Sequence, residues 1–516
     1  MSERAPVVCE SLEEIASFVS SLQRKGVQLW SQDGRLHYKA PRGVLSTPEL
    51  ARLRFMREQV LALLQMHSAG SPMPLSFSQL ARWNFYQCGE LRSCRQMAAA
   101  VRMVGPLQPD VLERSIAAVV YRQDALRTRI VACDGTPVQE VDPPGEVNLP
   151  VQDLSALPEP VRLHEIQRVL DECILEHLDL ARGPLFVAKL LRFSAREHVL
   201  VVAMEHMISD AFSLNILLRE ILTAYGQLAS GHSLALPPIG VQFAEHARRQ
   251  RASVTDVLCD RWLERLKGCQ RLRFSVPELD AHAPCGIGRV PIKVGRTLTA
   301  QLRQWARQQR TTLALTMFTA YVALVLRMCR VDEGVIQYEI NGRYGPEVEN
   351  TIGYFASQLY LRMQMHENDR FIDLLARAIQ EYCRAHEQSV FSSCTAARVP
   401  RPEFARNTLF NWVPRGRSDI EHTCLAGMAD PIHCSTLEFE HPALRAINLD
   451  YEPSILLCET DEEIAGGIYF PQSRFSTALM ECFARAFLGM AHALLGQPHG
   501  RIKDVKLEAG TCFDGL

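Results

Sequence analysis

The sequence predicts an α/β protein with two lobes behind a small N-terminal unit. Strand-like apolar runs alternate with amphipathic helices along most of the chain, which is typical of an α/β core. About 435 residues follow residue 75, more than one hydrophobic core usually holds. A stretch rich in Ser, Gly and Pro separates them from the start of the chain. We therefore expect a unit at 1–67, a linker at 68–74, and lobes at 75–250 and 251–510.

Composition narrows the class of protein further. The net charge is −2 over 516 residues, which gives no general attraction to nucleic acid or to a membrane surface. The N-terminus lacks a signal pattern, and no apolar run approaches the roughly 20 residues that span a bilayer. The 16 cysteines are scattered, without a C-x-x-C pair. We expect a cytoplasmic monomer with reduced thiols and no metal.

The first 67 residues predict the order helix, hairpin, helix. The segment S-L-E-E-I-A-S-F-V-S-S-L places its apolar residues on one helical face, and Gly26 can end that helix. Two short strands then flank Asp33-Gly34, a pair that suits a tight turn. Ser46 and Glu49 form a capping-box pattern that opens the second helix.

This unit is also strongly basic. Eight Lys and Arg residues lie between Arg24 and Arg57, against only Asp33 and Glu49, which gives a local charge of +6. A solvated face is one interpretation, and a docking surface on which an acidic peptide adds an edge strand is the other. The arrangement resembles the β-hairpin docking domains of assembly-line synthetases, which capture the C-terminal tail of a carrier protein. The candidate docking residues are Lys25, Arg35, Lys39, Arg42 and Arg52.

Beyond the linker, several elements are expected from periodicity. Residues Val199–Met204 form a continuous apolar run typical of a buried strand, and Ser213–Leu228 has helical spacing. Helices are also expected over Thr299–Gln309 and Leu313–Cys329, and a strand over G-V-I-Q-Y-E-I at 334–340.

His206 and Asp210 follow the first of these strands at a spacing of four residues. The spacing H-x-x-x-D is common and weak by itself. Its position is more informative, because α/β proteins place ligands beyond the ends of their buried strands. A histidine there can act as a general base near neutral pH. The aspartate can orient the ring or pair with an arginine, and the spacing does not choose between them.

The stretch E-H-M-I-S-D-A-F-S, residues 205–213, resembles the His-His-x-x-x-Asp-Gly motif of nonribosomal peptide synthetase condensation domains. His206 matches the second histidine, which is catalytic in that family, and Asp210 matches the aspartate. Ser213 matches a serine that often follows. Glu205 stands in place of the first histidine and Ala211 in place of the glycine.

Other family motifs are matched in the same order along about 340 residues. The matches begin with P-L-S-F-S-Q-L-A-R-W, in which the family's arginine is lost at Ala81. In I-N-G-R-Y-G-P-E-V-E-N-T-I-G-Y-F the pattern is kept, but Ala356-Ser357-Gln358 replaces the Val-Asn-Thr that follows it. The remaining matches are Y-R-Q-D-A-L-R-T-R-I, L-D-L-A-R-G-P-L and F-A-R-N-T-L-F-N, so the resemblance covers roughly residues 74–495.

This resemblance implies a chloramphenicol-acetyltransferase-like fold, in which two α/β lobes form a V around a tunnel. It implies acyl transfer from a thioester on the phosphopantetheine arm of an acyl or peptidyl carrier protein to an amine or alcohol acceptor. The arm comes from the partner, so no bound cofactor is expected. His206 would accept the nucleophile's proton, and Asp210 would pair with Arg343. Nothing resembling an adenylation or carrier domain follows, which suggests a free-standing enzyme of chain release.

Five further residues are candidates for the oxyanion site or the tunnel. The N–H of Ala211 could bind an oxyanion, although positive φ would strain an alanine there. Glu205 could support the site or select a polar acceptor, and Ser213 completes the motif. Ser357 could face the tunnel or the core. For Trp412 we favour packing over lining the tunnel.

Three other classes compete with this interpretation. Plant-type acyl-CoA-dependent transferases share the H-x-x-x-D core, but their late Asp-Phe-Gly-Trp-Gly motif is missing here. Epimerisation domains share the central motif, but a docking unit that collects a carrier fits condensation better. A catalytically inactive platform that recruits carrier proteins is the third, and the joint retention of His206, Asp210 and Arg343 argues against it.

Overall fold

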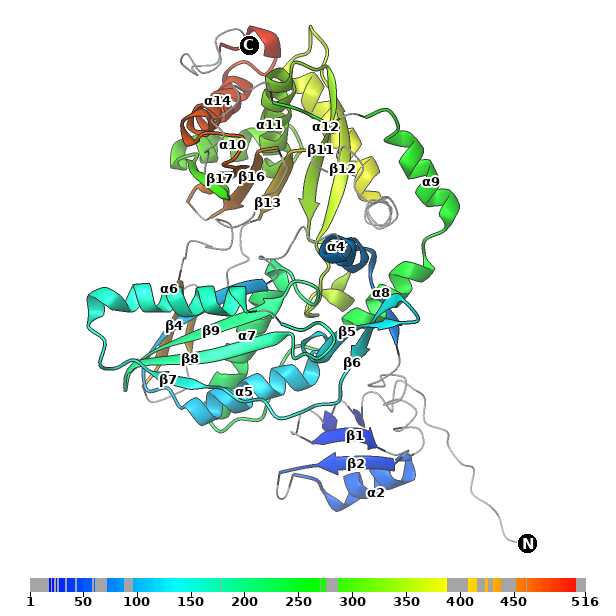
Figure 1. Ribbon diagram of the computed structural model, residues 1–516, viewed down its shortest axis with the longest axis vertical. Coiled ribbons are helices and arrows are strands. Elements are labelled where there is room, and N and C mark those ends of the chain that lie inside the picture. Colours follow the sequence, from blue (N-terminus) through cyan, green and yellow to red (C-terminus); the bar gives the residue numbers. More distant parts are fainter. Residues whose placement is uncertain are drawn as a thin grey trace.

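The computed structural model describes residues 18–506 apart from residues 20, 23–24, 26, 33–34, 42–43, 58–59, 61–71, 88–95, 177, 270, 275–285, 388–406, 415–422, 426–429, 438–451 and 461. A small N-terminal unit lies at one end, followed by two α/β lobes stacked along the long axis (Figure 1). The predicted α/β class, with an N-terminal hairpin unit, is confirmed.

The N-terminal unit contains the hairpin and the second helix that the sequence predicts. Strands β1 (Gln28–Gln32) and β2 (Arg35–Lys39) pair antiparallel, and α2 spans Thr47–Phe55. The capping box is present: Ser46 Oγ accepts the Glu49 N–H at 3.4 Å, and Glu49 Oε2 accepts the Ser46 N–H at 3.0 Å. The predicted first helix and the turn at Asp33-Gly34 lie largely outside the described residues.

This unit is in contact with the first lobe. The Leu29 N–H donates to Tyr121 Oη at 3.2 Å, and Tyr121 Oη donates back to the Leu29 carbonyl at 3.4 Å. Tyr121 lies in α5 (Pro109–Arg122), so strand β1 faces the lobe while β2 and α2 lie further away (Figure 1). The unit has a core of its own, formed by Phe18, Val19, Leu22, Val27, Leu29, Leu53, Met56 and Val60.

The first lobe is built on a six-stranded sheet with the order β14-β15-β4-β9-β8-β7. Helices α5 and α7 pack on one face and α6 on the other. The strands are β4 (Gln96–Val104), β7 (Val151–Asp153), β8 (Phe186–Ser194), β9 (Glu197–Glu205), β14 (Thr423–Leu425) and β15 (Ile432–Leu437), and the helices are α6 (Glu159–Leu175) and α7 (Ala211–Ala229).

Strand β9 lies in the interior of this sheet and is covered on both faces. Leu200, Val202 and Met204 belong to the core under α5 and α7, whereas Val199 and Val201 belong to the core under α6. Side chains alternate between the faces of a strand, so a strand covered twice must be apolar at every position. This explains the continuous apolar run in the sequence. The residues after Glu205 lie beyond the carboxyl end of this interior strand.

The second lobe has a six-stranded sheet with the order β10-β17-β16-β13-β11-β12, and its helices pack into one large core. The predicted helix Leu313–Cys329 is confirmed at those bounds as α11. The strands are β10 (Ile287–Lys293), β11 (Glu333–Ile340), β12 (Ser357–Gln364), β13 (Leu409–Val413), β16 (Ser454–Glu459) and β17 (Ile464–Pro471), and the other helices are α10 (Arg296–Gln308), α12 (Phe371–Glu387) and α14 (Thr477–Gly496).

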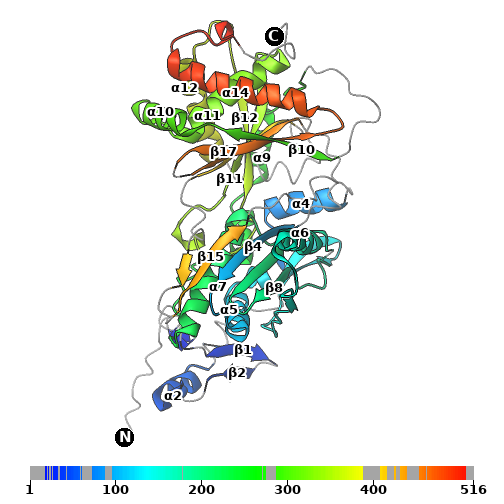
Figure 2. The same cartoon turned by 90° about the vertical axis from the view of Figure 1, so that its left-hand side faces the viewer.

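One late segment of the chain crosses back into the first lobe. Strand β15 pairs antiparallel with β4, from His433↔Val104 to Leu437↔Ala100. Figure 2 shows the orange β15 beside the blue β4. The division at residue 250 that the sequence suggests does not describe this exchange, which joins the two lobes through a shared sheet.

Smaller elements connect the lobes and surround the site. Helix α4 lies between the lobes in Figure 1, and α9 runs along their side. A third sheet has the order β3-β6-β5. These elements are β3 (Met73–Pro74), α4 (Phe77–Gln87), η1 (Asp124–Arg127), β5 (Thr128–Cys133), β6 (Thr136–Val141), α8 (Phe243–Ala252), α9 (Asp256–Arg265), η2 (Pro346–Val348) and η5 (Ile502–Asp504).

One cysteine and one helix bear on the expectations from composition. Cys259 is disulfide-bonded, so the expectation that all thiols are reduced is wrong at this residue. Helix α14 is long and apolar enough to cross a membrane by length and composition alone. However, residues such as Phe483, Phe487 and Met490 are buried in the second lobe, and helices of a protein core pass the same criterion.

Candidate active site

His206 follows directly on the last residue of β9 and is held by its own loop. Its Nδ1 lies 2.7 Å from the Ser209 carbonyl oxygen. A carbonyl only accepts, so Nδ1 carries the proton and the neutral ring keeps a lone pair on Nε2. Among the described residues Nε2 has no hydrogen-bond partner. The ring therefore presents a proton acceptor beyond the end of the strand.

The surroundings of His206 keep it neutral. Burial, and then the positive charge of Arg82, lower the pKa of His206 from 6.5 to about 3. The ring is nevertheless half-buried rather than sealed, and the Tyr354 ring meets it edge-on at 4.6 Å between centroids. A side chain that is surrounded by protein yet partly accessible is expected on the wall of an interior space. His206 thus has the state and the access that a general base needs.

Asp210 forms the expected ion pair with Arg343. Its Oδ2 lies 2.7 Å from Arg343 Nη1, and both side chains are at most 5% exposed. The same oxygen accepts the N–H groups of Phe355 at 3.0 Å and Ala356 at 3.1 Å. Burial alone would raise the pKa of Asp210, but the Arg343 charge and the bonds from Ser213 lower it below its ordinary value. Asp210 is therefore a carboxylate that ties the two lobes together.

Ser213 belongs to the same junction rather than to a substrate space. Asp210 caps α7 by accepting the Ser213 N–H at 2.8 Å. The Ser213 hydroxyl lies 2.9 Å from Asp210 Oδ1 and 2.7 Å from the Gly353 carbonyl, and it accepts the Gly353 N–H and Arg343 Nη2. Because Ser213 is fully buried and engaged by protein, the expected role at the oxyanion or tunnel is wrong for it.

Ala211 is compatible with the backbone where the family has glycine. It is the first residue of α7, and it is not among the described residues with positive φ. Its methyl group is exposed. The strain that a positive φ would cause is therefore absent, and the substitution adds a methyl group to accessible space at the helix N-terminus.

Glu205 has a structural environment that its sequence position did not reveal. It is fully buried, and its Oε1 accepts the Tyr86 hydroxyl at 2.6 Å. Tyr86 in turn accepts Arg82 Nε at 2.8 Å, and both residues lie in α4. Glu205 thus bonds a side chain of α4. This contact links α4 to the residue before His206, which agrees with a supporting role.

The opening motif also holds the loop of His206. Gln79 Nε2 donates to the Met207 carbonyl at 2.9 Å, and the Gln79 side chain accepts the Ser76 N–H at 2.8 Å. Gln79 is fully buried. The Ser and Gln that resemble the family pattern therefore fix the backbone one residue beyond the candidate base.

The remaining candidates belong to the second lobe and to the N-terminal unit. Ser357 is half-buried at the start of β12, opposite Ile340. Trp412 packs against the core of the second lobe, as we favoured. In the N-terminal unit Lys39 is exposed, Lys25 pairs with Glu49, and the Arg52 guanidinium lies 4.5 Å from the Phe18 ring. The side chains of Arg35 and Arg42 lie outside the described residues.

Sequence reasoning missed several site residues: Arg82, Tyr86, Tyr354 and Glu339. Arg82 stands one position after Ala81, where the family's arginine is missing, and this shift was the available signal. Glu339 is half-buried in β11 beside Gln358 of β12, and burial raises its pKa from 4.5 to about 7. The charges of Asp210 and Arg82 also act on it, so it lies in the same region between the lobes.

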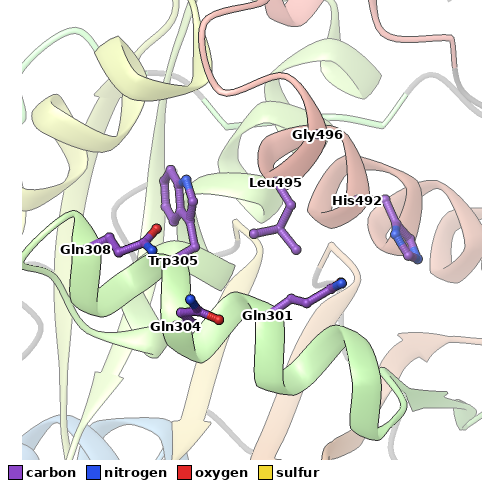
Figure 3. Close-up of a pocket in the computed structure, with 7 residues that line it drawn as sticks. All are labelled: Gln301, Gln304, Trp305, Gln308, His492, Leu495 and Gly496. Carbon is purple, nitrogen blue, oxygen red and sulfur yellow. The ribbon is translucent and has the colours of Figure 1, made fainter.

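Two other kinds of site, a metal site and a surface pocket, were compared with the surroundings of His206. The described part of the chain holds no cluster of three or more His, Cys, Asp or Glu side chains suited to a metal ion. A pocket of about 430 Å³ lies on the second lobe between α10 and α14, lined by four glutamine or histidine side chains with Trp305 and Leu495 (Figure 3). It involves no residue of the His206 site.

The comparison with protein families agrees with this geometry. The Condensation domain family model matches residues 71–509. The chain belongs to the condensation-domain family. A second model, for the TubC N-terminal docking domain, matches residues 15–65, which cover the described hairpin and α2. The chain is thus a condensation domain of the nonribosomal peptide synthetase type, preceded by a docking domain.

Curated relatives of this condensation domain are much longer proteins. The chain is 27% identical over 443 residues to a linear gramicidin synthase of Brevibacillus parabrevis, which covers 84% of this chain and 8% of that protein. It is 29% identical over 321 residues to the phosphinothricin tripeptide synthetase PhsC of Streptomyces viridochromogenes, covering 61% of this chain and 30% of the relative. The chain therefore spans less than a third of the length of these relatives.

Solved structures show the same fold. The X-domain from teicoplanin biosynthesis superposes with a TM-score of 0.71 at 18% identity, over 85% of this chain and 98% of that one. The starter condensation domain of rhizomide synthetase gives 0.67 at 18% identity, over 85% of this chain and all of the other. At such identities the likeness supports the two-lobed fold and leaves the activity to be argued from the site.

Proposed function

We propose that this condensation domain transfers an acyl or polyketide chain from a carrier-protein phosphopantetheinyl thioester to an amine or hydroxyl acceptor, and so releases the chain. Membership of the condensation family supports acyl transfer in general. The neutral His206, with its Nδ1–H bonded to Ser209 and its Nε2 lone pair accessible, is the observation that carries the proposal. The donor thioester is a substrate here, supplied by a cytoplasmic partner protein.

The proposed step balances with His206 as the only proton carrier. The acceptor's nitrogen or oxygen attacks the thioester carbon while His206 Nε2 takes its proton. The new C–N or C–O bond forms, and the C–S bond breaks when the tetrahedral intermediate collapses. The thiolate of the arm then receives the proton from Nε2, which returns the ring to its neutral form. Asp210 and Arg343 take no part in proton transfer, because they hold the loop and α7 against the other lobe.

The reaction can be tested with the full chain. A candidate carrier is loaded with an acyl thioester and offered amine and alcohol acceptors, and the products are followed by intact-protein mass spectrometry. We expect loss of the acyl group from the carrier with an amide or ester product. An intact thioester after carrier binding has been demonstrated would contradict the proposal and favour a recruitment platform. Epimerised product without transfer would favour an epimerisation domain.

We further propose that the docking domain binds a carrier protein through an acidic C-terminal tail. The support is the family match together with the exposed positive charge of Lys39 on β2. Tyr121 binds the backbone of β1, so β2 is the strand of the hairpin that faces away from the lobe. An extended acidic segment added to β2 would gain backbone hydrogen bonds from the edge and charge complementarity from the lysine.

A further inference from the structure

A chain of polar contacts links α4 to the candidate base. Arg82 and Tyr86 are four residues apart and so lie on one face of α4. Arg82 Nε donates to Tyr86 Oη at 2.8 Å, and Tyr86 Oη donates to Glu205 Oε1 at 2.6 Å. Glu205 immediately precedes His206. The unit of Arg82, Tyr86 and Glu205, which we call the α4 polar unit, thus connects the helix between the lobes with the end of β9.

The cation of this unit and the imidazole of His206 both lie close to the Tyr354 ring. The Arg82 guanidinium carbon is 5.8 Å from the centre of the Tyr354 ring, and that ring is 4.6 Å from the His206 ring. Arg82 is half-buried, like His206 and Tyr354. Burial opposes the charged form of Arg82, but Tyr86, Tyr354 and Glu205 together outweigh it and raise the pKa of Arg82. The cation is therefore permanent, and Tyr86 and Tyr354 fix its position.

We propose that Arg82 is a positioning residue of the active site: held by Tyr86 and Glu205 close to the Tyr354 ring that meets His206, its cation opposes a second positive charge on that imidazole and so, together with burial, sets the acid limit of the reaction. This inference rests on the proposed function for its consequence in catalysis. It assigns a purpose to Glu205, because its carboxyl group accepts the Tyr86 hydroxyl that holds Arg82 and acts on Arg82 as a negative charge, which a histidine at that position could not supply.

The other groups around His206 do not replace this effect. Asp210, at the start of α7, acts in the opposite direction and favours the imidazolium, but Arg343 already pairs with its carboxylate. Tyr354, from the segment between β11 and β12, is neutral because burial raises its pKa. Glu339 in β11 interacts with Arg82 and Tyr354, and it is not among the largest influences on the pKa of His206. Arg82 is thus the cation that acts on the base.

Arg82→Met, Arg82→Lys and wild type separate an electrostatic role from a structural one. Methionine keeps much of the length and apolar stem but removes the charge, whereas lysine keeps the charge and loses the guanidinium geometry. Arg162→Met is the matched control: Arg162 also stacks on an aromatic ring, Phe193 at 5.4 Å, and pairs with a carboxylate, Glu197 at 2.8 Å. Glu197 begins β9, about 26 Å along the strand from Glu205.

Two measurements are made on each full-length variant: the pH dependence of single-turnover acyl transfer, and a 13C NMR titration of the His206 ring, assigned with His206→Ala. We expect Arg82→Met to move both midpoints upward, so that the ratio of protonated to neutral His206 at a given pH rises about tenfold or more. Arg82→Lys should restore most of the wild-type midpoint, and Arg162→Met should leave it unchanged.

The outcomes distinguish this inference from the proposed function. Superimposable His206 titrations in Arg82→Met and wild type would overturn the inference, whatever the turnover. Equal shifts in Arg82→Met and Arg82→Lys would also overturn it, since the effect would then follow packing and not charge. A wild type that does not transfer acyl groups would contradict the proposed function, and the NMR titration would still decide whether Arg82 controls the state of His206.

Discussion

Asp210 joins helix α7 to the second lobe through a single carboxylate. One carboxylate oxygen accepts two contacts from Ser213, and the other accepts Arg343 and the N–H groups of Phe355 and Ala356. Its charge matters because Arg343 is buried beside it. At the residue scale, therefore, the H-x-x-x-D motif divides into a histidine that is accessible for chemistry and an aspartate that is enclosed by the fold.

We predict that Asp210→Asn lowers the free energy of unfolding at pH 7 by roughly 3–5 kcal/mol, because it leaves Arg343 buried without its counter-charge. The lowered pKa of Asp210 means that its contribution is present above the ordinary value of 3.8 and lost as the pH falls through the folded-state pKa. The difference between the variants should therefore shrink below pH 4. Urea unfolding measures this loss of stability. The control is Asp153→Asn, because Asp153 is exposed and pairs with Arg192, and its free energy of unfolding should lie within about 1 kcal/mol of wild type. A deficit at Asp210→Asn no larger than that of the control would contradict this assignment.

The sequence predicts part of the site well and part not at all. His206, Asp210 and Arg343 lie in motifs whose spacing is local, so they can be found by inspection. Arg82 and Glu339 reach the same region from α4 and β11, and only tertiary packing brings them there. The burial of Glu205 was hidden for the same reason, because its partner Tyr86 is 119 residues away in sequence.

At the scale of elements, the segment between β11 and β12 holds the two lobes together. We call this segment, residues 341–356, the clasp. Its residues bind Asp210 and Ser213, and Gln123 of the first lobe accepts the Ile352 N–H at 3.0 Å. Periodicity predicted β9, α7 and α11 because each has an apolar pattern of its own. It could not predict that β15 joins the sheet of the first lobe, because strand partners are set by contacts far apart in the chain.

Gly342 tests the clasp directly. Its φ is +61°, and a Cβ there would lie 2.0 Å from the Phe355 carbonyl oxygen. We predict that Gly342→Ala displaces the segment that carries Arg343, lowers stability by about 1–3 kcal/mol and reduces acyl transfer more than tenfold. Gly489→Ala is the control, because nothing lies within 4 Å of its Cβ and alanine favours the helix. Thermal unfolding and acyl-transfer rates are measured for both variants. A Gly342→Ala protein with the stability and the transfer rate of wild type would contradict the role of the clasp.

At the scale of the whole molecule, the docking domain and the active site are at separate places. The docking domain contacts α5 through Tyr121. His206 directly follows Glu205, which bonds Tyr86 of α4, and α4 lies between the lobes (Figure 1). Charge on the docking domain should therefore affect capture of the carrier and not the chemical step. Because the two sites are separate, the docking unit and the catalytic motif can each be identified from the sequence. Neither of them identifies the acceptor molecule.

We predict that Lys39→Glu weakens binding of a carrier protein with an acidic tail at least about fivefold, as measured by KM or Kd at low salt, with kcat unchanged. Lys293→Glu is the matched control, since Lys293 is an exposed lysine on β10, an edge strand of the sheet of the second lobe. Equal binding by Lys39→Glu and wild type, or an equal loss in both variants, would contradict the docking role of β2.

The most direct test of the central claim, that His206 is the base of acyl transfer, is the single-turnover rate of transfer from a loaded carrier in His206→Ala. General-base catalysis predicts a fall of roughly 10²–10⁴-fold with carrier binding intact. His492→Ala, in the pocket of the second lobe, should transfer at the wild-type rate. Transfer by His206→Ala at a rate close to that of wild type would contradict the account.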